Sequence, residues 1–242
     1  VGPLLEARLA ALASDGLEVT ACGTTDTARH ADLMQRAEIL WNVMAPVSAG
    51  SLSGAPALRF VQKLGVGLNG IDLEAARARG VAVANMPGTN ARAVAEMTLS
   101  LMLAALRRLA FLDRTCREGG WAVAPDVQDR LGEIGGRTVG LVGYGSIPRL
   151  LAPVLQAMGA RVLYTARTPK PDAIGEWRSL PDLLAESDIV SLHLTLAPET
   201  TGIIGRDAIA RMKPGAVLVN TARGTLVDEV ALVDALRSGH LA

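Results

Sequence analysis

The sequence predicts an α/β protein whose parallel sheets are covered by helices on both faces. Short apolar runs typical of buried strands alternate with helix-like segments along the 242 residues. A glycine-rich turn, Gly143-Tyr144-Gly145, follows one of these runs and precedes a helix-like segment. Parallel strands are joined by crossovers that usually contain a helix, so this alternation favours a parallel sheet.

The first domain is expected over residues 1–87. Asp72 is a favourable helix N-cap with Glu74 in the first turn, and Gly80 would end that helix. The chain enters a helical pattern at its start, whereas an α/β domain more naturally begins with a strand, so we expect further residues before Val1. Strands are predicted over Leu17–Ala21, Ile39–Val43, Phe60–Leu64 and Val81–Ala84, and helices over Leu4–Ala13, Ala31–Ala37 and Asp72–Arg79.

The second domain is expected over residues 88–242, after a break at Asn85-Met86-Pro87-Gly88. It opens with a long helix, Ala91–Arg108, which is apolar on nearly all sides and is therefore expected to be buried. Residues 119–136 are rich in glycine and polar groups, which predicts a long connection. Strands are then predicted over Thr138–Val142, Arg161–Tyr164, Ile189–Leu192 and Ala216–Asn220, and helices over Ser146–Met158, Leu180–Ser187, Arg206–Met212 and Asp228–Ser238.

Composition and charge argue against several functional classes. Lys+Arg and Asp+Glu are both 24, and a neutral chain with scattered charges offers no electrostatic surface for nucleic acid. The longest apolar stretch, Met97–Leu106, is too short for a membrane span, which takes about 20 residues. Cys22 and Cys116 suit neither a disulfide framework nor a metal site. We therefore expect free thiols, no bound metal and a cytoplasmic protein.

The glycine-rich turn carries the first two glycines of a dinucleotide-binding fingerprint. Gly143 would permit the tight turn, and Gly145 would let the backbone approach a pyrophosphate. Ser146 and Ile147 begin the next helix, so their N–H groups and the positive end of the helix dipole would face the phosphates. Pro148 replaces the third glycine; its ring is tolerated in a first turn but can hold the helix away from the strand. The alternative is an ordinary tight turn.

The end of the next strand bears on which dinucleotide is bound. NAD sites usually place an acidic residue there to bond the ribose 2′-hydroxyl. Here the strand ends without a carboxylate, and Arg167, accompanied by Thr165, Thr168 and Lys170, suits a 2′-phosphate. The sequence therefore favours NADP, with NAD as the alternative if Arg167 and Lys170 are ordinary surface charges.

Seven motifs occur in one order and give the chain a specific resemblance. From about Phe60 onward it resembles the D-isomer-specific 2-hydroxyacid dehydrogenases, which include phosphoglycerate dehydrogenase and glyoxylate/hydroxypyruvate reductase. The resemblance implies a flavodoxin-like substrate domain followed by a Rossmann dinucleotide-binding domain. The motifs are Gly65-Val66-Gly67-Leu68-Asn69-Gly70-Ile71-Asp72, Asn85-Met86-Pro87-Gly88, Val94-Ala95-Glu96, the glycine-rich turn, Asp188-Ile189-Val190-Ser191-Leu192-His193-Leu194, Met212-Lys213-Pro214-Gly215, and Asn220–Gly224 followed by Val227-Asp228.

The resemblance also implies roles for individual residues. Arg223 would bind the carboxylate and carbonyl of a 2-keto acid, and its guanidinium could stabilise charge that develops on the substrate oxygen. The amides of Val66 and Gly67 would bind the carboxylate, since the glycines there allow close backbone approach. The remaining implied cofactor contacts are His193, Leu194, Thr200, Thr221 and Ala222.

The sequence departs from the family pattern at several positions. Asn69-Gly70 stands where Asp-Asn is usual, and Thr195 stands where proline is common. The family's catalytic Glu and His lie downstream of the arginine, so we expect them beyond residue 242, together with the last strands of the Rossmann sheet.

The three histidines are weighed as possible proton donors, because histidine titrates near neutral pH. His30 lies in a polar stretch far from the cofactor motif, and His240 follows the last helix. His193 alone is near the cofactor motif, and the resemblance makes it a pocket residue and not the donor. Asp188 and Asp228 are interpreted as caps, and Glu96 as structural.

The predicted function is hydride transfer between NAD(P)H and a small 2-keto acid, such as glyoxylate or hydroxypyruvate, giving the D-2-hydroxy acid. One alternative is a non-catalytic NAD(H)-sensing protein that resembles the corepressors built on this fold. Another is a formate-dehydrogenase-like enzyme on the same fold. A homodimer is expected from the resemblance, with the helix 91–108 and the arm at Gly120-Trp121 as interface elements.

Overall fold

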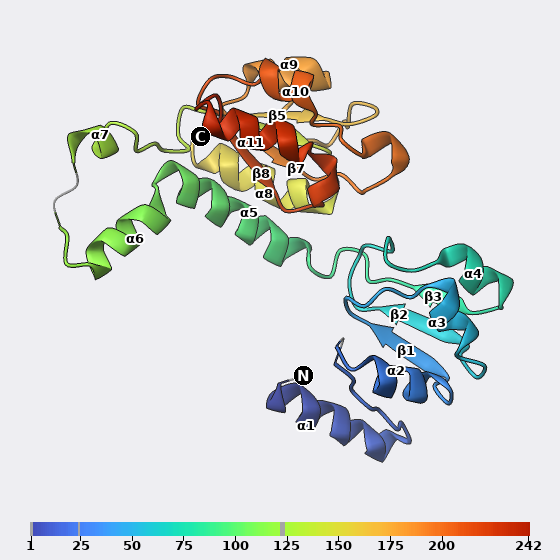
Figure 1. Cartoon of the computed structure of the whole chain (residues 1–242). Helices are drawn as coiled ribbons and strands as arrows, with labels where there is room; N and C mark the ends of the chain where they lie inside the picture. Colours follow the sequence, from blue (N-terminus) through green and yellow to red (C-terminus); the bar gives the residue numbers. More distant parts are fainter. Residues whose placement is uncertain (1, 24, 122–123) are drawn as a thin grey trace. The chain divides into compact units, whose positions relative to one another are not determined.

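The computed structural model describes residues 2–23, 25–121 and 124–242, and the chain divides into two compact units, Val1–Thr89 and Asn90–Ala242 (Figure 1). Both units contain parallel sheets connected through helices, so the predicted α/β fold class is confirmed. In the described part of the chain, no helix combines the length and apolar character that a membrane span requires.

The first unit contains a three-stranded parallel sheet in the order β1-β2-β3. Its core packs Val61 of β2 against Leu52 and Ala76 of two helices, whereas Ile39 and Trp41 of β1 are exposed. The Asp72 carboxylate accepts a hydrogen bond from the Ala75 N–H at 2.9 Å, which confirms the predicted N-cap. The elements are α1 (Pro3–Ala11), η1 (Leu12–Asp15), α2 (Thr27–Met34), β1 (Ile39–Asn42), α3 (Ala49–Ser53), β2 (Phe60–Lys63), α4 (Leu73–Ala78) and β3 (Ala82–Ala84).

One local prediction in the first unit was wrong, and one helix was missed. Residues 17–21 form no strand, because no described segment pairs with them beside β1, and a strand is stable only within a ladder. The helix α3 was not predicted. It begins at Ser48, whose hydroxyl accepts a hydrogen bond from the Ser51 N–H at 3.2 Å.

The second unit contains a five-stranded parallel sheet in the order β6-β5-β4-β7-β8. Strand addition therefore changes direction at β4, since β5 and β6 lie on one side of it and β7 and β8 on the other. Open α/β sheets bind ligands at such a switch point, beyond the carboxyl ends of the strands. The strands are β4 (Thr138–Val142), β5 (Arg161–Thr165), β6 (Glu176–Trp177), β7 (Ile189–Leu192) and β8 (Val217–Asn220).

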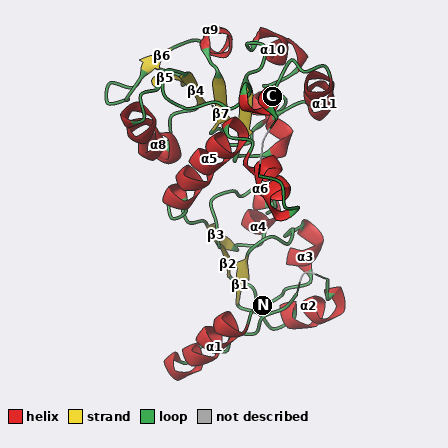
Figure 2. Ribbon diagram, turned by 90° about the vertical axis from the view of Figure 1, so that its left-hand side faces the viewer, coloured by secondary structure: helices red, strands yellow, loops and turns green. Residues whose placement is uncertain are grey.

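Helices cover both faces of this sheet (Figures 1 and 2). The buried face of α5 packs with α8 against one side, and α9, α10 and α11 form the core on the other side. Both cores consist largely of leucine, valine, isoleucine and alanine, as expected from a chain with 3 % aromatic residues. These helices are α5 (Ala91–Leu106), α8 (Ser146–Ala157), α9 (Leu180–Glu186), α10 (Arg206–Arg211) and α11 (Glu229–Arg237).

The region around the long helix differs from the prediction. Met97 and Leu101 are exposed on α5, so the helix is buried on one face and not on all sides. Arg108 adopts a left-handed conformation (φ 49°) that ends α5 and starts a second helix, α6 (Leu109–Arg117). A short helix, α7 (Pro125–Gln128), interrupts the predicted connection. These breaks depend on single backbone conformations that the apolar pattern does not encode.

Candidate functional site

Four strand ends meet at the carboxyl edge of the second sheet, and each carries a predicted site residue. The register pairs Val142 of β4 with Thr165 of β5 on one side and with Leu192 of β7 on the other. Leu192 in turn pairs with Asn220 of β8. The glycine-rich turn, the Arg167 loop, His193 and the Asn220–Gly224 turn therefore leave the sheet at the same edge.

The glycine-rich turn has the geometry that its sequence predicts. Gly143 has a φ of 97°, a conformation that favours glycine, and its N–H donates to the Thr165 carbonyl at 3.0 Å. A Cβ at Gly143 would lie 2.7 Å from the His193 carbonyl oxygen, so this glycine also allows the β7 loop to pack closely. At Gly145 a Cβ would meet nothing within 4 Å, which leaves open space above the start of α8.

The first turn of α8 faces that open space. Gly145 is the N-cap of α8, and the first internal hydrogen bond runs from the Arg149 N–H to the Gly145 carbonyl at 3.2 Å. The N–H groups of Ser146 and Ile147 precede this bond and so have no acceptor within the helix. Pro148 is buried in the same turn, where its missing N–H leaves no donor unpaired.

Arg167 is exposed two residues beyond the end of β5. Within the described parts of the chain, its guanidinium has no carboxylate partner and no hydrogen-bond acceptor. Thr168 is also exposed, and Thr165 is half-buried at the strand end. An unpaired guanidinium beside two hydroxyl side chains is suited to binding a phosphate.

His193 is held at the end of β7 in a largely buried position. Its Nε2 lies 2.9 Å from the hydroxyl of Ser191, whereas its buried Nδ1 has no hydrogen-bond partner among the described residues. Burial lowers the pKa of His193 to about 4. The ring is therefore neutral near pH 7, so it is a poor proton donor there. The unpaired Nδ1 marks a polar position where a bound ligand would complete the hydrogen bonding.

The other predicted residues of the β7 loop have different surroundings. The Leu194 side chain would contact a Cβ at Gly143, so it packs beside the glycine-rich turn. The Thr200 hydroxyl accepts from the Ala197 N–H at 2.8 Å and contacts the Thr195 carbonyl at 2.8 Å. In this structure the Thr200 hydroxyl therefore stabilises the loop that it belongs to.

The Asn220–Gly224 turn is braced by its own asparagine. The Asn220 side chain accepts from the Ala222 N–H at 3.0 Å and donates to the Arg223 carbonyl at 2.8 Å. A hydrogen bond to helix α5 also holds the turn. The Thr221 hydroxyl lies 3.0 Å from the hydroxyl of Thr98, a fully buried residue of α5. Thr98 already donates to the Val94 carbonyl at 2.7 Å, so Thr221 is the donor of the shared bond.

Arg223 is exposed on this braced turn. Its guanidinium donates to the Ala222 carbonyl at 2.7 Å and has no carboxylate partner within the described ranges. An exposed arginine whose other N–H groups are available can bind a substrate carboxylate through two hydrogen bonds. The sequence identified Arg223 and the glycine-rich turn but missed Thr98, because its partner is 123 residues away.

Val66 and Gly67 lie in the first unit, in the loop that follows β2. The Val66 carbonyl accepts a hydrogen bond from the Asn85 side chain at 2.7 Å, and the Gly65 carbonyl accepts from the Met86 N–H at 2.9 Å. The N–H groups of Val66 and Gly67 donate to no described residue. This arrangement holds the loop from its carbonyl side and leaves two amides available to an anion.

The remaining candidates have structural partners. The Asp228 carboxylate caps α11 by accepting from the Ala231 N–H at 3.0 Å. Asp188 accepts from the Thr138 N–H at 2.7 Å and pairs with Lys213 at 2.9 Å. Burial raises the pKa of Asp188, but these two partners outweigh it and hold the pKa below its ordinary value. The ring of His240 bonds the Ile209 carbonyl at 2.9 Å, whereas His30 belongs to the first unit and Glu96 is an exposed residue of α5.

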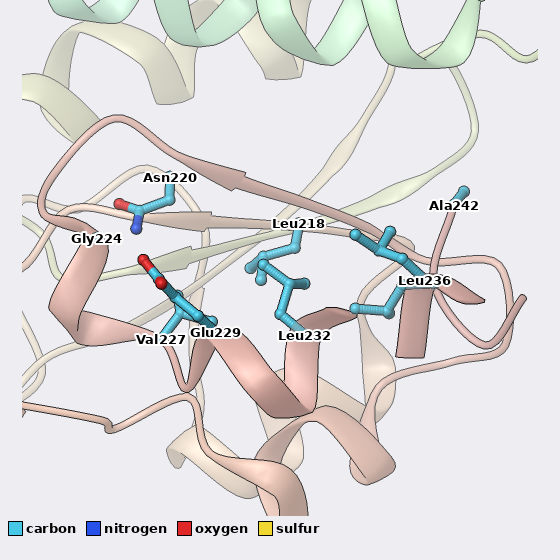
Figure 3. A pocket seen from close by; sticks show the side chains of 9 residues that line it. Leu218, Asn220, Gly224, Val227, Glu229, Leu232, Leu236 and Ala242 are labelled. Carbon is cyan, nitrogen blue, oxygen red and sulfur yellow. The ribbon is translucent and has the colours of Figure 1, made fainter. Parts of the chain in front are cut away.

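A groove of about 210 Å³ lies between β8 and α11 (Figure 3). The Leu218, Leu232 and Leu236 side chains point toward one another across it, and Asn220 and Glu229 lie at one end. Near its other end, Leu241 pairs in parallel with Ala216, next to β8. The groove is mostly apolar and reaches the Asn220–Gly224 turn only at Asn220 and Gly224, so it is distinct from the glycine-rich turn. No group of three or more metal-binding side chains occurs in the described residues.

A parallel sheet with a switch point, open space at Gly145 and free amides at the start of α8 define a dinucleotide-binding α/β protein. Residues 99–242, more than half of the chain, match the family model described as "D-isomer specific 2-hydroxyacid dehydrogenase, NAD binding domain". The chain therefore belongs to the D-isomer-specific 2-hydroxyacid dehydrogenase family, which confirms the resemblance found in the sequence.

Individual relatives agree with this assignment. D-3-phosphoglycerate dehydrogenase of Mycobacterium leprae is 45% identical over 199 residues, covering 81% of this chain and 37% of the relative. Glyoxylate reductase of Aeropyrum pernix is 41% identical over 217 residues, covering 86% and 65%. A crystal structure of the TT0316 protein from Thermus thermophilus superposes with a TM-score of 0.88 at 41% identity, covering 96% and 75%. The chain thus spans little more than a third of the mycobacterial relative.

Proposed function

We propose that this chain supports NADPH-dependent reduction of a small 2-keto acid, such as glyoxylate or hydroxypyruvate, to the D-2-hydroxy acid. The observation that carries the proposal is Arg223, an exposed arginine without a carboxylate partner among the described residues, on a turn at the same sheet edge as the glycine-rich turn. The similarity to a glyoxylate reductase supports this substrate class.

Arg223 would bind the substrate carboxylate and the carbonyl oxygen. Its guanidinium is always protonated, so it can stabilise the negative charge that grows on the carbonyl oxygen during reduction. The bound cofactor would supply the hydride to the carbonyl carbon, and the resulting alkoxide oxygen would take its proton from the His–Glu pair that the family resemblance implies downstream of Arg223. Thr221 and Ala222 precede Arg223 on the same turn and would contact the nicotinamide side of the cofactor.

We propose a separate binding role for each of the two units. The second unit, predicted as residues 88–242, would bind the cofactor through Gly143, Gly145 and the amides of Ser146 and Ile147. His193, Leu194 and Thr200 would line the same pocket. The first unit, predicted as residues 1–87, would bind the substrate through the N–H groups of Val66 and Gly67. Their available amides support this role.

NADP is proposed over NAD because of the β5 loop. Arg167 is exposed and unpaired among the described residues, and Thr165 and Thr168 could add hydrogen bonds to a 2′-phosphate. A direct comparison of the Kd values for NADPH and NADH tests this preference. Tighter binding of NADH would contradict it. We also propose a homodimer, supported by the exposed Met97 and Leu101 of α5 and by Trp121.

The decisive experiment replaces Arg223 with alanine in the protein. We expect kcat/KM for glyoxylate and hydroxypyruvate to fall at least about 10²–10³-fold, with the Kd for NADPH nearly unchanged, because the arginine acts on the substrate oxygen. Arg237→Ala, an exposed arginine at the end of α11, is the matched control and should retain activity.

The substrate panel separates the proposal from its alternatives. Oxidation of formate without reduction of 2-keto acids would favour a formate-dehydrogenase-like enzyme. Cofactor binding without turnover of any member of the panel would favour a nucleotide sensor. Unchanged kcat/KM in Arg223→Ala would remove the basis of the proposal.

A further inference from the structure

Both tyrosines of the chain lie under the loop that carries Arg167. Tyr144 is the middle residue of the glycine-rich turn, and Tyr164 is the penultimate residue of β5. Both side chains are buried, and their ring centroids are 4.6 Å apart with the planes tilted by 47°. Rings tilted at this separation attract each other beyond the effect of burial, so the two tyrosines form a buried platform under the loop.

Each tyrosine hydroxyl binds both backbone groups of one loop residue. The Tyr164 hydroxyl accepts from the Lys170 N–H at 2.8 Å and donates to the Lys170 carbonyl at 3.2 Å. The Tyr144 hydroxyl accepts from the Ile174 N–H at 2.8 Å and donates to the Ile174 carbonyl at 3.2 Å. A buried hydroxyl with both roles satisfied is costly to replace, because the loop groups would lose their partners.

Two further side chains hold the same loop from outside. The Arg149 guanidinium donates to both carboxylate oxygens of Asp172, one bond measuring 3.2 Å, and lies 5.4 Å from the centre of the Tyr144 ring. The Trp177 indole N–H donates to the Ala166 carbonyl at 3.2 Å. The loop over residues 166–174 is therefore anchored at Ala166, Lys170, Asp172 and Ile174.

Arg167, Thr168 and Pro169 form one exposed stretch of this loop, and Pro171 and Asp172 are exposed further along it. These three residues lie between the anchors at Ala166 and Lys170, so their backbone has little freedom although their side chains face solvent. A binding loop that is ordered before the ligand arrives loses less conformational entropy on binding.

We propose that Tyr144, Tyr164 and Arg149 are positioning residues that fix the Arg167 loop and thereby set the preference for a 2′-phosphorylated cofactor. This inference rests on the proposed NADP preference. The hydroxyls do not touch the 2′-phosphate; they act through the backbone that presents Arg167 and Thr168. Losing a hydroxyl should therefore weaken binding of a 2′-phosphate and leave binding of the adenosine diphosphate moiety almost unchanged.

The test uses 2′,5′-ADP and 5′-AMP as probes, because these two ligands differ only in the 2′-phosphate. Tyr164→Phe and Tyr144→Phe remove one hydroxyl each, and Asp172→Asn weakens the exposed Arg149 contact without altering the buried platform. Asp234→Asn is the matched control, since Asp234 pairs with Arg206 at 2.9 Å on the other side of the unit's sheet. We expect about a tenfold weaker Kd for 2′,5′-ADP in the tyrosine variants, a smaller loss in Asp172→Asn, and less than about a twofold change for 5′-AMP in every variant.

Trypsin provides a readout that needs no nucleotide. Within the loop, cleavage is expected after Arg167 only, because Lys170 is followed by Pro171 and that bond resists the protease. The tyrosine variants should be cut after Arg167 faster than the unmodified protein and the Asp234→Asn control. Cleavage after Arg167 should also precede cleavage elsewhere in the chain, which separates loosening of the loop from the loss of global stability that removal of a buried hydroxyl causes.

The outcomes separate this inference from the function on which it rests. If the unmodified protein binds 2′,5′-ADP no more tightly than 5′-AMP, the NADP preference itself is wrong and the selectivity role falls with it. If the unmodified protein prefers 2′,5′-ADP but the tyrosine variants keep that preference and resist trypsin equally, the NADP preference stands and the positioning role is overturned.

Discussion

The loop after β5 and the turn after β8 leave the same sheet edge but are held by different kinds of contact. The β5 loop is anchored by Tyr144, Arg149 and Trp177 from other elements and by Tyr164 from β5. The Asn220–Gly224 turn is held mainly by the Asn220 side chain, with Thr98 as the helix residue that contacts it by a hydrogen bond.

The difference corresponds to the proposed tasks of the two regions. A turn that presents one arginine to a small substrate can be fixed by local hydrogen bonds, since only a few residues must be ordered. A loop of nine residues, 166–174, has more conformations to lose and needs anchors along its length. The β5 loop, which we propose selects the cofactor, therefore depends on side chains that have no proposed contact with the cofactor.

The glycine-rich turn lies next to the β5 loop, and Gly143→Ala should have the largest effect on stability. The new Cβ would lie 2.7 Å from the His193 carbonyl oxygen, and φ is 97°. Left-handed strain and overpacking together predict a loss of about 4 kcal/mol in the free energy of unfolding. Urea denaturation monitored by circular dichroism measures this loss.

Gly145→Ala is the matched control for Gly143→Ala. Its Cβ would meet nothing within 4 Å and φ is −95°, so only the poorer N-cap preference of alanine should lower stability, by about 1 kcal/mol, while NADPH binding weakens. Equal destabilisation by the two alanines would show that the two glycines are not distinguished by packing.

The contrast between local and long-range contacts also explains what the sequence could reveal. Four of the five strands of the second sheet and most of its helices were predicted, because apolar runs and turn residues are local signals. The two-residue strand β6 and the break at Arg108 were missed, since they depend on pairing and on one backbone angle. The strand predicted over residues 17–21 was wrong for the opposite reason. The composition of this segment suits a strand, but no neighbouring strand pairs with it.

The same distinction holds for the site. The glycine-rich turn and Arg223 follow directly from short motifs, and the Asn220 brace has a local signal in its spacing from Ala222. The contacts of Tyr144 with Ile174 and of Thr98 with Thr221 cross 30 and 123 residues, and no pattern in one sequence encodes them.

His193 follows β7, which lies between β4 and β8 in the sheet order. Because its ring is largely buried, we expect the stability of the protein to depend on pH. Its pKa is about 4 in the folded state because of burial, against about 6.5 when unfolded. Between these values the unfolded state binds the extra proton, so stability falls as the pH is lowered from about 6.5 to 4, by about 3 kcal/mol in total. Denaturation midpoints across this range measure the slope.

His193→Gln removes the titrating group and should flatten that slope. His30→Gln, in the first unit, is the matched control and should leave it in place. An acid slope that persists in His193→Gln would assign the effect to other groups and would leave the unpaired Nδ1 without a thermodynamic consequence.

The smallest effect is expected from the brace of the β8 turn, and it tests the claim that this turn is held locally. Asn220→Ala removes two hydrogen bonds, worth about 1 kcal/mol each, so kcat/KM for glyoxylate should fall by about 10- to 30-fold at an unchanged Kd for NADPH. Thr98→Val removes one long-range bond to the same turn and should reduce kcat/KM by only about fivefold.

Asn220→Asp keeps the acceptor for the Ala222 N–H and loses the donor to the Arg223 carbonyl, so its activity should lie between those of Asn220→Ala and the unmodified protein. A larger loss in Thr98→Val than in Asn220→Ala would mean that the helix, and not the turn's own asparagine, positions Arg223, and the contrast with the β5 loop would disappear.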